Sequence, residues 1–274
     1  MDVLLILKAL ILGLVEAASE FLPISSTGHL IIVGDFLDFT GPRAESFEIF
    51  IQLGAILSVV WIYRKQLGET ILNLNGDPKA RRLVTNLVIA FIPAAVLGLL
   101  LHKQITHLLF NPVSVAGALV VGGIVILLIE RYSRSARVQT VDEMTWKDAA
   151  VVGIAQSVSL FPGVSRSGAT IMGGMLGGMS RFAATEFSFF LAIPTMFAAT
   201  GYSLYKEWGG LTSADVPMFA VGFVAAFLGG LTVVRFLLNY VGQNSFAPFA
   251  YYRIVFGGLL LAYFHYHPWV GKGG

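Results

Sequence analysis

Long apolar segments alternate with two stretches in which polar residues interrupt the apolar pattern of this 274-residue chain. Six apolar segments have about the length that a bilayer crossing needs, and predict transmembrane helices near 46–63, 84–101, 113–130, 187–205, 217–237 and 248–265. Residues 3–22 carry two acidic residues, and residues 25–37 are shorter than the roughly 20 residues of a span. Irregular backbone at membrane depth is tolerated where protein or a water-filled cavity surrounds it. We therefore interpret 1–37 as a re-entrant helical hairpin with Pro23 at its turn.

The same arrangement occurs twice along the chain. A second hairpin, 148–179, precedes the last three spans and aligns with the first at an offset of 140 residues, which pairs Gly13, Glu16, Ser25 and Gly28 with Gly153, Gln156, Ser165 and Gly168. This pattern predicts one membrane domain over 1–274, with repeat one at about 1–135 and repeat two at about 147–267. Because each repeat has an odd number of full spans, we expect an inverted-topology repeat whose two hairpin turns meet near the membrane midplane.

Composition supports an all-α integral membrane protein. Hydrophobic residues make up 56% of the chain, charged residues only 12%, and the mean hydropathy is +0.77. The net charge of +2 and the lack of long basic runs argue against a nucleic-acid partner. The chain has no cysteine, which excludes disulfides, thiol catalysis and thiolate metal sites. Glycine pairs within the apolar segments predict close helix packing and a surface for a homodimer.

Lysine and arginine are distributed unevenly between the loops. Segments 34–46 and 102–112 hold two basic residues, whereas the loops on the other side hold nine, which are Arg64, Lys65, Lys79, Arg81, Arg82, Arg131, Arg134, Arg137 and Lys147. The positive-inside rule assigns the basic loops to the cytoplasm. Both termini are then expected outside, and the first hairpin enters the membrane from the outer side.

Ionisable residues inside apolar segments predict function, since one at the membrane centre costs about 2.5–3.5 kcal/mol even on lenient scales. Glu16 and Glu20 are four residues apart, so on a helix both carboxylates lie on one face. They could ligate a divalent cation, Mg²⁺ or Ca²⁺, or act as an acid and a base. The alternative is a structural ion pair with Arg166, which would leave the other carboxylate as a buried like charge.

The residues after each turn suit an oxyanion. A run of hydroxyl residues at a helix start offers free N–H groups and favours anions. An arginine between two serines offers a planar fork for phosphate, although an arginine can also snorkel to the cytoplasmic surface. The predicted phosphate-binding residues are Ser25, Thr27, Ser165, Arg166, Ser167 and Thr170.

Ser26 and His29 are the candidates for attack or proton transfer. His29 lies three residues after Ser26, on the adjoining helix face, and could be a general acid, a nucleophile or a metal ligand, or else a satisfied core histidine. Ser26 is a candidate nucleophile if His29 takes its proton, and otherwise a capping hydroxyl that holds substrate oxygens. The residues leave serine, histidine and water open as the attacking group.

With these residues established, the chain closely resembles the bacterial undecaprenyl-diphosphate phosphatase family, also called the bacitracin resistance protein family. The resemblance extends along nearly the whole chain and is carried by three segments, Glu16-x-x-x-Glu20-Phe-Leu-Pro-Ile-Ser-Ser-Thr-Gly-His29, Phe47-Glu-Ile-Phe-Ile-Gln-Leu-Gly54 and Phe161-Pro-Gly-Val-Ser-Arg-Ser-Gly-Ala-Thr170.

The resemblance implies an enzyme that removes the terminal phosphate of undecaprenyl diphosphate and so recycles the carrier lipid of cell-wall synthesis. It also implies divalent-metal dependence and a site open to the outer, periplasmic face of the inner membrane. Carried over, Glu16 and Glu20 would be metal or acid/base groups, Arg166 the phosphate clamp, and Ser26 and His29 the groups for attack or proton transfer.

Two other functions stay open on the residues alone. Inverted repeats with broken helices and midplane charges are typical of secondary transporters, so a lipid flippase or a transporter of a phosphorylated substrate is the alternative. A carboxylate pair beside serine and histidine favours hydrolysis over transport. A divalent-cation channel is a weaker interpretation, because the acids occur in only one repeat.

Overall fold

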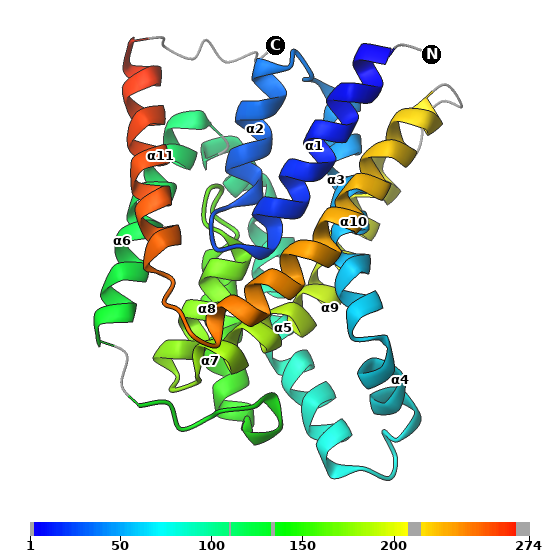
Figure 1. Cartoon of the computed structure of the whole chain (residues 1–274), viewed down its shortest axis with the longest axis vertical. Coiled ribbons are helices and arrows are strands. Elements are labelled where there is room, and N and C mark those ends of the chain that lie inside the picture. The colour runs from blue at the N-terminus through cyan, green and yellow to red at the C-terminus, as the bar shows by residue number, and fades with distance from the viewer. Residues whose placement is uncertain (1–2, 110, 133–134, 208–214, 267–274) are drawn as a thin grey trace.

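The structure, a computed structural model, describes residues 3–109, 111–132, 135–207 and 215–266, with 42, 102–109 and 203–207 described by their backbone alone. Over these residues the chain is helical (Figure 1). The elements in chain order are α1 (Val3–Phe21), α2 (Ser26–Phe36), α3 (Pro42–Ile62), α4 (Arg64–Leu72), α5 (Pro78–Leu109), α6 (Pro112–Tyr132), the 3₁₀-helix η1 (Val141–Glu143), α7 (Trp146–Val158), α8 (Arg166–Leu176), α9 (Arg181–Glu207), α10 (Val216–Val241) and α11 (Ala247–Tyr266).

Among the described helices, six are long and apolar enough to cross a membrane. Each overlaps one predicted span, and they cover Arg43–Ile62, Pro78–Leu101, Pro112–Tyr132, Arg181–Tyr202, Val216–Val241 and Ala247–Tyr266. The prediction of an all-α protein with six spans is therefore confirmed by length and composition. The predicted loop 64–83 contains the short helix α4, which has no buried residue. Of the basic residues counted in the loops, Arg134 lies outside the described residues.

The two predicted hairpins are both helix–turn–helix units. Helix α1 ends two residues before Pro23, and α2 begins after Ser25, whose Oγ accepts a hydrogen bond from the N–H of Gly28 at 3.5 Å. Helix α8 begins in the same way, because Ser165 Oγ accepts from the N–H of Gly168 at 3.1 Å. Aligned serines thus cap the second helix of each hairpin.

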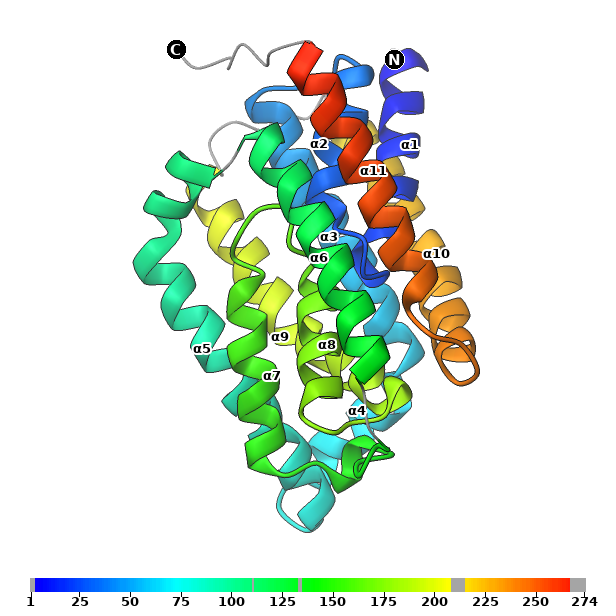
Figure 2. The same cartoon turned by 90° about the vertical axis from the view of Figure 1, so that its left-hand side faces the viewer.

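The hairpins approach each other from opposite ends of the molecule. Helices α1 and α2 extend from the end where α1 begins and α11 ends, whereas α7 and α8 extend from the end where α4 lies (Figures 1 and 2). Helix α1 packs against α10, and α7 packs against α5. A Cβ at Gly13 would lie 2.9 Å from Ala225 Cβ, and one at Gly153 would lie 2.7 Å from Ala90 O. Aligned glycines therefore permit both close crossings.

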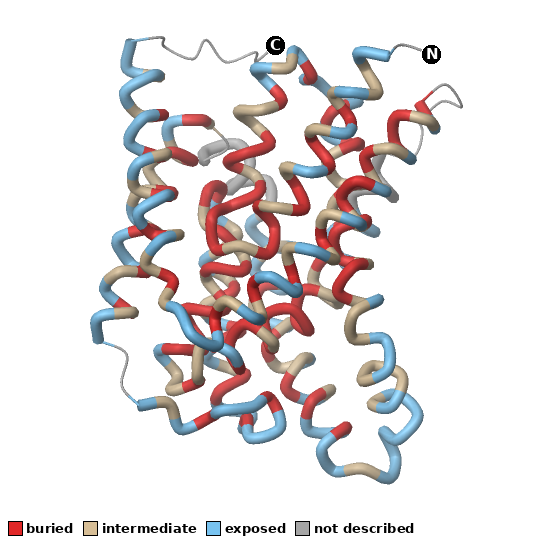
Figure 3. The backbone as a smooth tube through the Cα atoms, in the orientation of Figure 1, coloured by how far each residue is buried: buried red, intermediate tan, exposed pale blue. Residues whose placement is uncertain are grey.

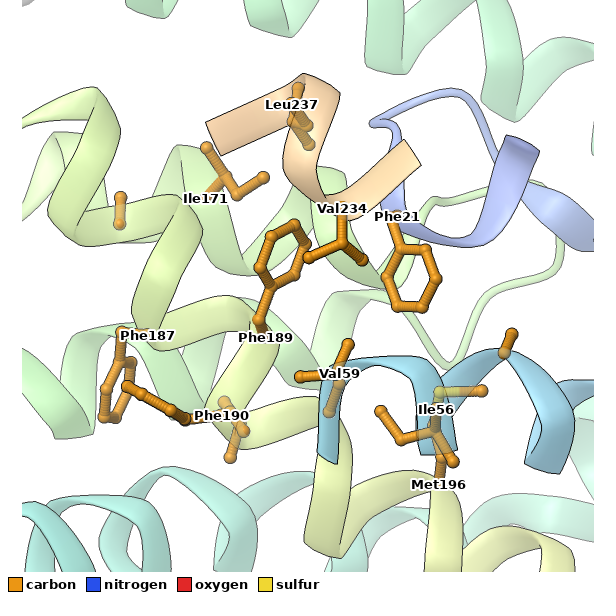
Figure 4. Close-up of a cluster of buried hydrophobic side chains, with 14 of the residues drawn as sticks. Phe21, Ile56, Val59, Ile171, Phe187, Phe189, Phe190, Met196, Val234 and Leu237 are labelled. Carbon is orange, nitrogen blue, oxygen red and sulfur yellow. The ribbon is translucent and has the colours of Figure 1, made fainter. Parts of the chain in front are cut away.

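Buried residues are concentrated where the hairpin turns meet α3, α9 and α10 (Figure 3). Figure 4 shows this cluster, in which the Phe189 ring of α9 lies edge-on to the Phe21 ring of α1 at a centroid distance of 5.6 Å. Ile56, Val59 and Val234 belong to the same cluster. Because lipid tails are as apolar as these side chains, close packing stabilises the cluster more than exclusion from water does.

Candidate active site between the two hairpins

A carboxylate, a hydroxyl and a guanidinium meet at the junction of the hairpins. Glu20 is at the end of α1, where its Oε1 accepts from Arg166 Nη2 at 2.9 Å and its Oε2 accepts from Ser26 Oγ at 2.6 Å. The side chains of Glu20 and Arg166 are only 8% and 13% exposed. The structure therefore brings together Glu20, Ser26 and Arg166 as expected. The alternative of Arg166 snorkelling to the cytoplasmic surface is wrong.

Helix α9 fixes the position of Arg166. The Nη1 group of Arg166 donates to Ser188 O at 3.0 Å, while Nε is buried and has no hydrogen-bond partner in the described part of the chain. Thr170 Oγ1 lies 2.7 Å from Ser188 Oγ and donates to Arg166 O at 3.0 Å. Thr170 thus supports the arginine from within the protein, and its predicted contact with phosphate stays a prediction. The unused Nε–H is a donor available to a bound oxyanion.

Glu16 differs from Gln156, the residue aligned with it in the second hairpin. Glu16 is fully buried, and neither of its carboxylate oxygens has a hydrogen-bond partner among the described residues. Gln156 is equally buried, but its amide donates to Ala90 O at 3.4 Å and accepts from Thr195 Oγ1 at 3.3 Å. A buried carboxylate without a partner is costly, so Glu16 requires either a proton or a bound cation.

The donor set fits a hard divalent cation, for which carboxylate oxygens are the preferred ligands. Glu16 offers two free oxygens, whereas both oxygens of Glu20 already accept hydrogen bonds. Over the described residues, no group of three or more His, Cys, Asp and Glu side chains is arranged to hold a metal ion. A cation here would therefore need water or substrate oxygens to complete its coordination, as Mg²⁺ commonly does.

His29 is fully engaged by its neighbours. Its Nδ1 lies 2.7 Å from Ser25 O, which can only accept, so Nδ1 carries the proton. In the neutral ring Nε2 is then an acceptor, and it lies 2.7 Å from the hydroxyl of Tyr252. The ring also stacks on Phe256 at a centroid distance of 4.8 Å. Ser26 donates to Glu20 and not to His29, so the expectation that His29 takes the serine proton does not match this geometry.

The remaining predicted hydroxyls shape the two turns. Ser25 has a positive φ of 74°, a conformation that is uncommon for a residue other than glycine. Ser165 Oγ lies 2.9 Å from Ser167 Oγ, which donates to Leu22 O at 3.0 Å and so links the second hairpin to the first. Thr27 is half-buried in the first turn of α2. Their predicted binding of phosphate stays a prediction.

Sequence reasoning overlooked Arg253 on α11. This arginine is 2% exposed, and its guanidinium donates to four backbone carbonyls at 3.1–3.2 Å, those of Pro23, Ala118, Leu119 and Gly163. Pro23 and Gly163 belong to the turns of the two hairpins, and Gly163 has a positive φ of 86° that suits glycine. Arg253 therefore fixes the two turns relative to each other. Its signal in the sequence was an arginine within the predicted span 248–265.

Fold and site together define a multi-pass helical membrane protein in which two hairpins assemble a buried polar centre from residues far apart in the sequence. The chain belongs to the bacitracin resistance protein BacA family, whose model matches residues 9–259. It is 54% identical over 262 residues to undecaprenyl-diphosphatase 1 of Pseudomonas fluorescens (strain Pf0-1), covering 96% of this chain and 95% of that protein. It is also 54% identical over 275 residues to undecaprenyl-diphosphatase of Janthinobacterium sp. (strain Marseille), covering 98% and 99% of the two chains.

Proposed function

We propose that this protein hydrolyses undecaprenyl diphosphate to undecaprenyl phosphate and inorganic phosphate, which recycles the carrier lipid for cell-wall synthesis and confers bacitracin resistance. The single observation that carries the proposal is the contact of Glu20 with both Ser26 and Arg166 at the junction of the hairpins. Phosphoryl transfer depends mainly on positioning and on neutralising charge at the phosphate oxygens. The site offers a hydroxyl, a base and a cation for these tasks.

Ser26 is the group that we propose attacks the terminal phosphorus. Its hydroxyl is 2.6 Å from Glu20 Oε2, so Glu20 can accept the proton as the Oγ–P bond forms and the bond from phosphorus to the bridging oxygen breaks. Undecaprenyl phosphate leaves, and water then attacks the phosphoserine to release inorganic phosphate. His29 is a weaker candidate, because Ser25 O and the Tyr252 hydroxyl engage both of its ring nitrogens.

Arg166 and the two helix starts would neutralise the phosphate. The arginine keeps one hydrogen bond to Glu20 and one to Ser188 O, which leaves its Nε–H available to a phosphate oxygen. Ser25 and Ser165 cap helices whose N-termini carry partial positive charge. Glu16 and Glu20 would hold Mg²⁺ or Ca²⁺, which when bound would neutralise further phosphate charge.

The membrane topology in this proposal is an inverted repeat with two re-entrant hairpins. Two helix contacts support it, because α1 of the first hairpin packs on α10 and α7 of the second hairpin packs on α5. The first arm of each hairpin thus contacts the second span of the other proposed repeat. On the positive-inside rule the active site opens to the periplasm and both termini lie outside. The homodimer also stays a proposal, with open space around Gly117 and Gly258 on α6 and α11 as its support.

Phosphate release from undecaprenyl diphosphate by the purified protein in detergent tests the proposed hydrolysis. We expect release that stops in chelator and resumes when Mg²⁺ or Ca²⁺ is added. Detergent micelles have no second compartment, so a flippase or secondary transporter would release nothing in this assay. Absence of release by folded protein with either cation would overturn the phosphatase assignment. Release that is unaffected by chelator would overturn only the proposed cation binding by Glu16 and Glu20, and it would leave the phosphatase assignment intact.

A further inference from the structure

A cavity of ≈ 450 Å³ lies beside the beginnings of α5 and α7. These are at the end of the molecule opposite to the start of α1 and the end of α2 (Figure 2). It is formed by the first turns of α5, the beginning of α7 and the residues just before α7, and its lining residues are Pro78, Arg81, Arg82, Thr85, Asn86, Met144, Thr145 and Trp146. This lining contains two cations and no carboxylate. None of these residues belongs to the proposed phosphatase site.

The two arginines are exposed and unpaired. Within the part of the chain that the structure describes, no carboxylate lies within ion-pair distance of either Arg81 or Arg82. Two nearby acids form ion pairs elsewhere, since Asp142 pairs with Lys79 at 3.0 Å and Asp148 pairs with Arg137. Two others accept backbone N–H groups, Asp77 from Lys79 at 2.9 Å and Glu143 from Gln139 at 2.7 Å. The charged side chains that line the cavity are therefore both positive, which favours an anion.

Contacts between α5 and the segment that leads into α7 hold the walls of the cavity in place. Asn86 is buried, and its Nδ2 donates to Met144 O at 3.2 Å, which holds the segment before α7 against α5. Helices α5 and α7 stay in close contact further along, where Gly153 leaves no room for a side chain beside Ala90. The polar wall on α5 and the Trp146 wall on α7 are thus held at a fixed separation.

An apolar surface continues from the cavity toward the middle of the membrane. Arg81, Thr85, Val88 and Ile92 recur at spacings of three and four, so they lie on one face of α5. Val88 and Ile92 are 51% and 50% exposed. On α7, Ile154 is 65% exposed, two turns beyond Trp146. Cationic residues at the membrane boundary with apolar residues below them match a molecule that has an anionic head and acyl chains.

We propose that this cavity binds the phosphate headgroup of an anionic phospholipid, with Arg81 and Arg82 contacting the phosphate and the acyl chains lying along α5 and α7. Trp146 is 60% exposed and has the amphipathic ring typical of the membrane interface. On the positive-inside rule this is the cytoplasmic leaflet. The site is independent of the proposed phosphatase activity.

Fluorescence of Trp146 tests the site directly. The full chain is prepared with Trp61, Trp208 and Trp269 replaced by phenylalanine, and phosphatidylglycerol with brominated acyl chains is titrated into its micelles as a quencher. We expect saturable quenching at a mole fraction at least fivefold lower than for brominated phosphatidylcholine. Quenching by the two lipids at the same mole fraction would overturn the proposal.

Charge-matched variants distinguish lipid binding in the cavity from a general effect of positive surface charge. An arginine near anionic lipid contributes about fivefold in affinity, so R81Q should raise the half-quenching mole fraction about fivefold and R81Q/R82Q about 25-fold. R64Q/K65Q removes the same charge from exposed positions at the same end of the molecule and should change it less than twofold. An equal effect of the two double variants would overturn the proposal.

Inorganic phosphate distinguishes a lipid from a free anion. Phosphate added in excess should leave the quenching by phosphatidylglycerol unchanged, and full displacement by phosphate would assign the cavity to a soluble anion instead. R81Q/R82Q should release phosphate from undecaprenyl diphosphate at the wild-type rate in zwitterionic detergent, which verifies that the variant is folded. If it is inactive, R81Q alone provides the comparison.

Discussion

Removal of the Arg166 guanidinium is the most direct perturbation of the proposed site. Arg166 is 2.9 Å from Glu20 and 3.0 Å from Ser188 O, and its side chain is only 13% exposed. Loss of one preorganised donor commonly costs about 10²–10³ in kcat, and loss of an arginine that neutralises a transferred phosphoryl group about 10³–10⁵. We therefore expect Arg166→Ala to lower kcat by about 10³. Arg166→Lys should lose about 10², since one ammonium cannot replace the planar fork.

The same substitution should destabilise the protein. Arg166→Ala leaves the Glu20 carboxylate buried without its cation, and breaking a buried pair from one side costs about 3–5 kcal/mol. Adding Glu20→Gln removes that charge, so the double variant should recover much of the thermal midpoint and none of the turnover. This difference separates a role in chemistry from a role in folding.

The assay is the initial rate of inorganic phosphate release from undecaprenyl diphosphate, measured on protein that elutes as a single folded species in detergent. Arg64→Ala is the control, because Arg64 is exposed and its guanidinium donates to Trp61 O. It should lose little activity. If Arg166→Ala released phosphate within about tenfold of the Arg64→Ala rate, the assignment of the clamp would be wrong.

Three further changes test the rest of the site and one ion pair outside it. Ser26→Ala should abolish a phosphoenzyme trapped in a single turnover and lower kcat by at least about 10³; a trapped phosphate on that variant would exclude Ser26 as the nucleophile. Arg253→Met should lower both the thermal midpoint and kcat, since four carbonyls lose their donor, and unchanged values would refute its positioning role. Burial raises the pKa of Asp148, but hydrogen bonds from Arg137 and Thr145 outweigh burial and lower it overall, so its stabilisation is present at neutral pH and lost in acid. The midpoint difference between wild type and Asp148→Asn should therefore shrink as the pH falls below about 4, and a constant difference would refute this.

The sequence predicted the fold well where one physical constraint dominates. A span must be apolar over its whole length, so the six membrane helices could be found from hydropathy alone. The turns could be located because Pro23 cannot continue a helix and Ser25 and Ser165 are favoured caps. The meeting of Glu20 with Arg166 agrees with the predicted inverted repeat, in which two hairpin turns lie near the membrane midplane.

Contacts that depend on rotamers and on neighbouring helices could not be predicted. Ser26 and His29 lie on adjoining positions of α2, but Ser26 donates to Glu20 and His29 to Ser25 O, with Tyr252 at the other ring nitrogen. Spacing along one helix cannot reveal a partner on α11. Arg253 was overlooked for a different reason. Its guanidinium donates to backbone carbonyls and not to an acidic side chain. Every residue has a backbone carbonyl, so the sequence cannot show which ones accept.

The contrast between Glu16 and Gln156 distinguishes the chemical roles of the two hairpins in the proposed site. Both side chains are buried at aligned positions, and the amide of Gln156 is satisfied by Ala90 O and Thr195. A carboxylate can only accept, so it could not donate to a carbonyl as Gln156 does. Glu16 therefore has an unmet requirement that a proton or a cation can satisfy. The second hairpin, with a neutral amide at this position, supplies the guanidinium of Arg166 instead. The division of negative and positive groups between two similar hairpins means that the proposed site is complete only where their turns meet.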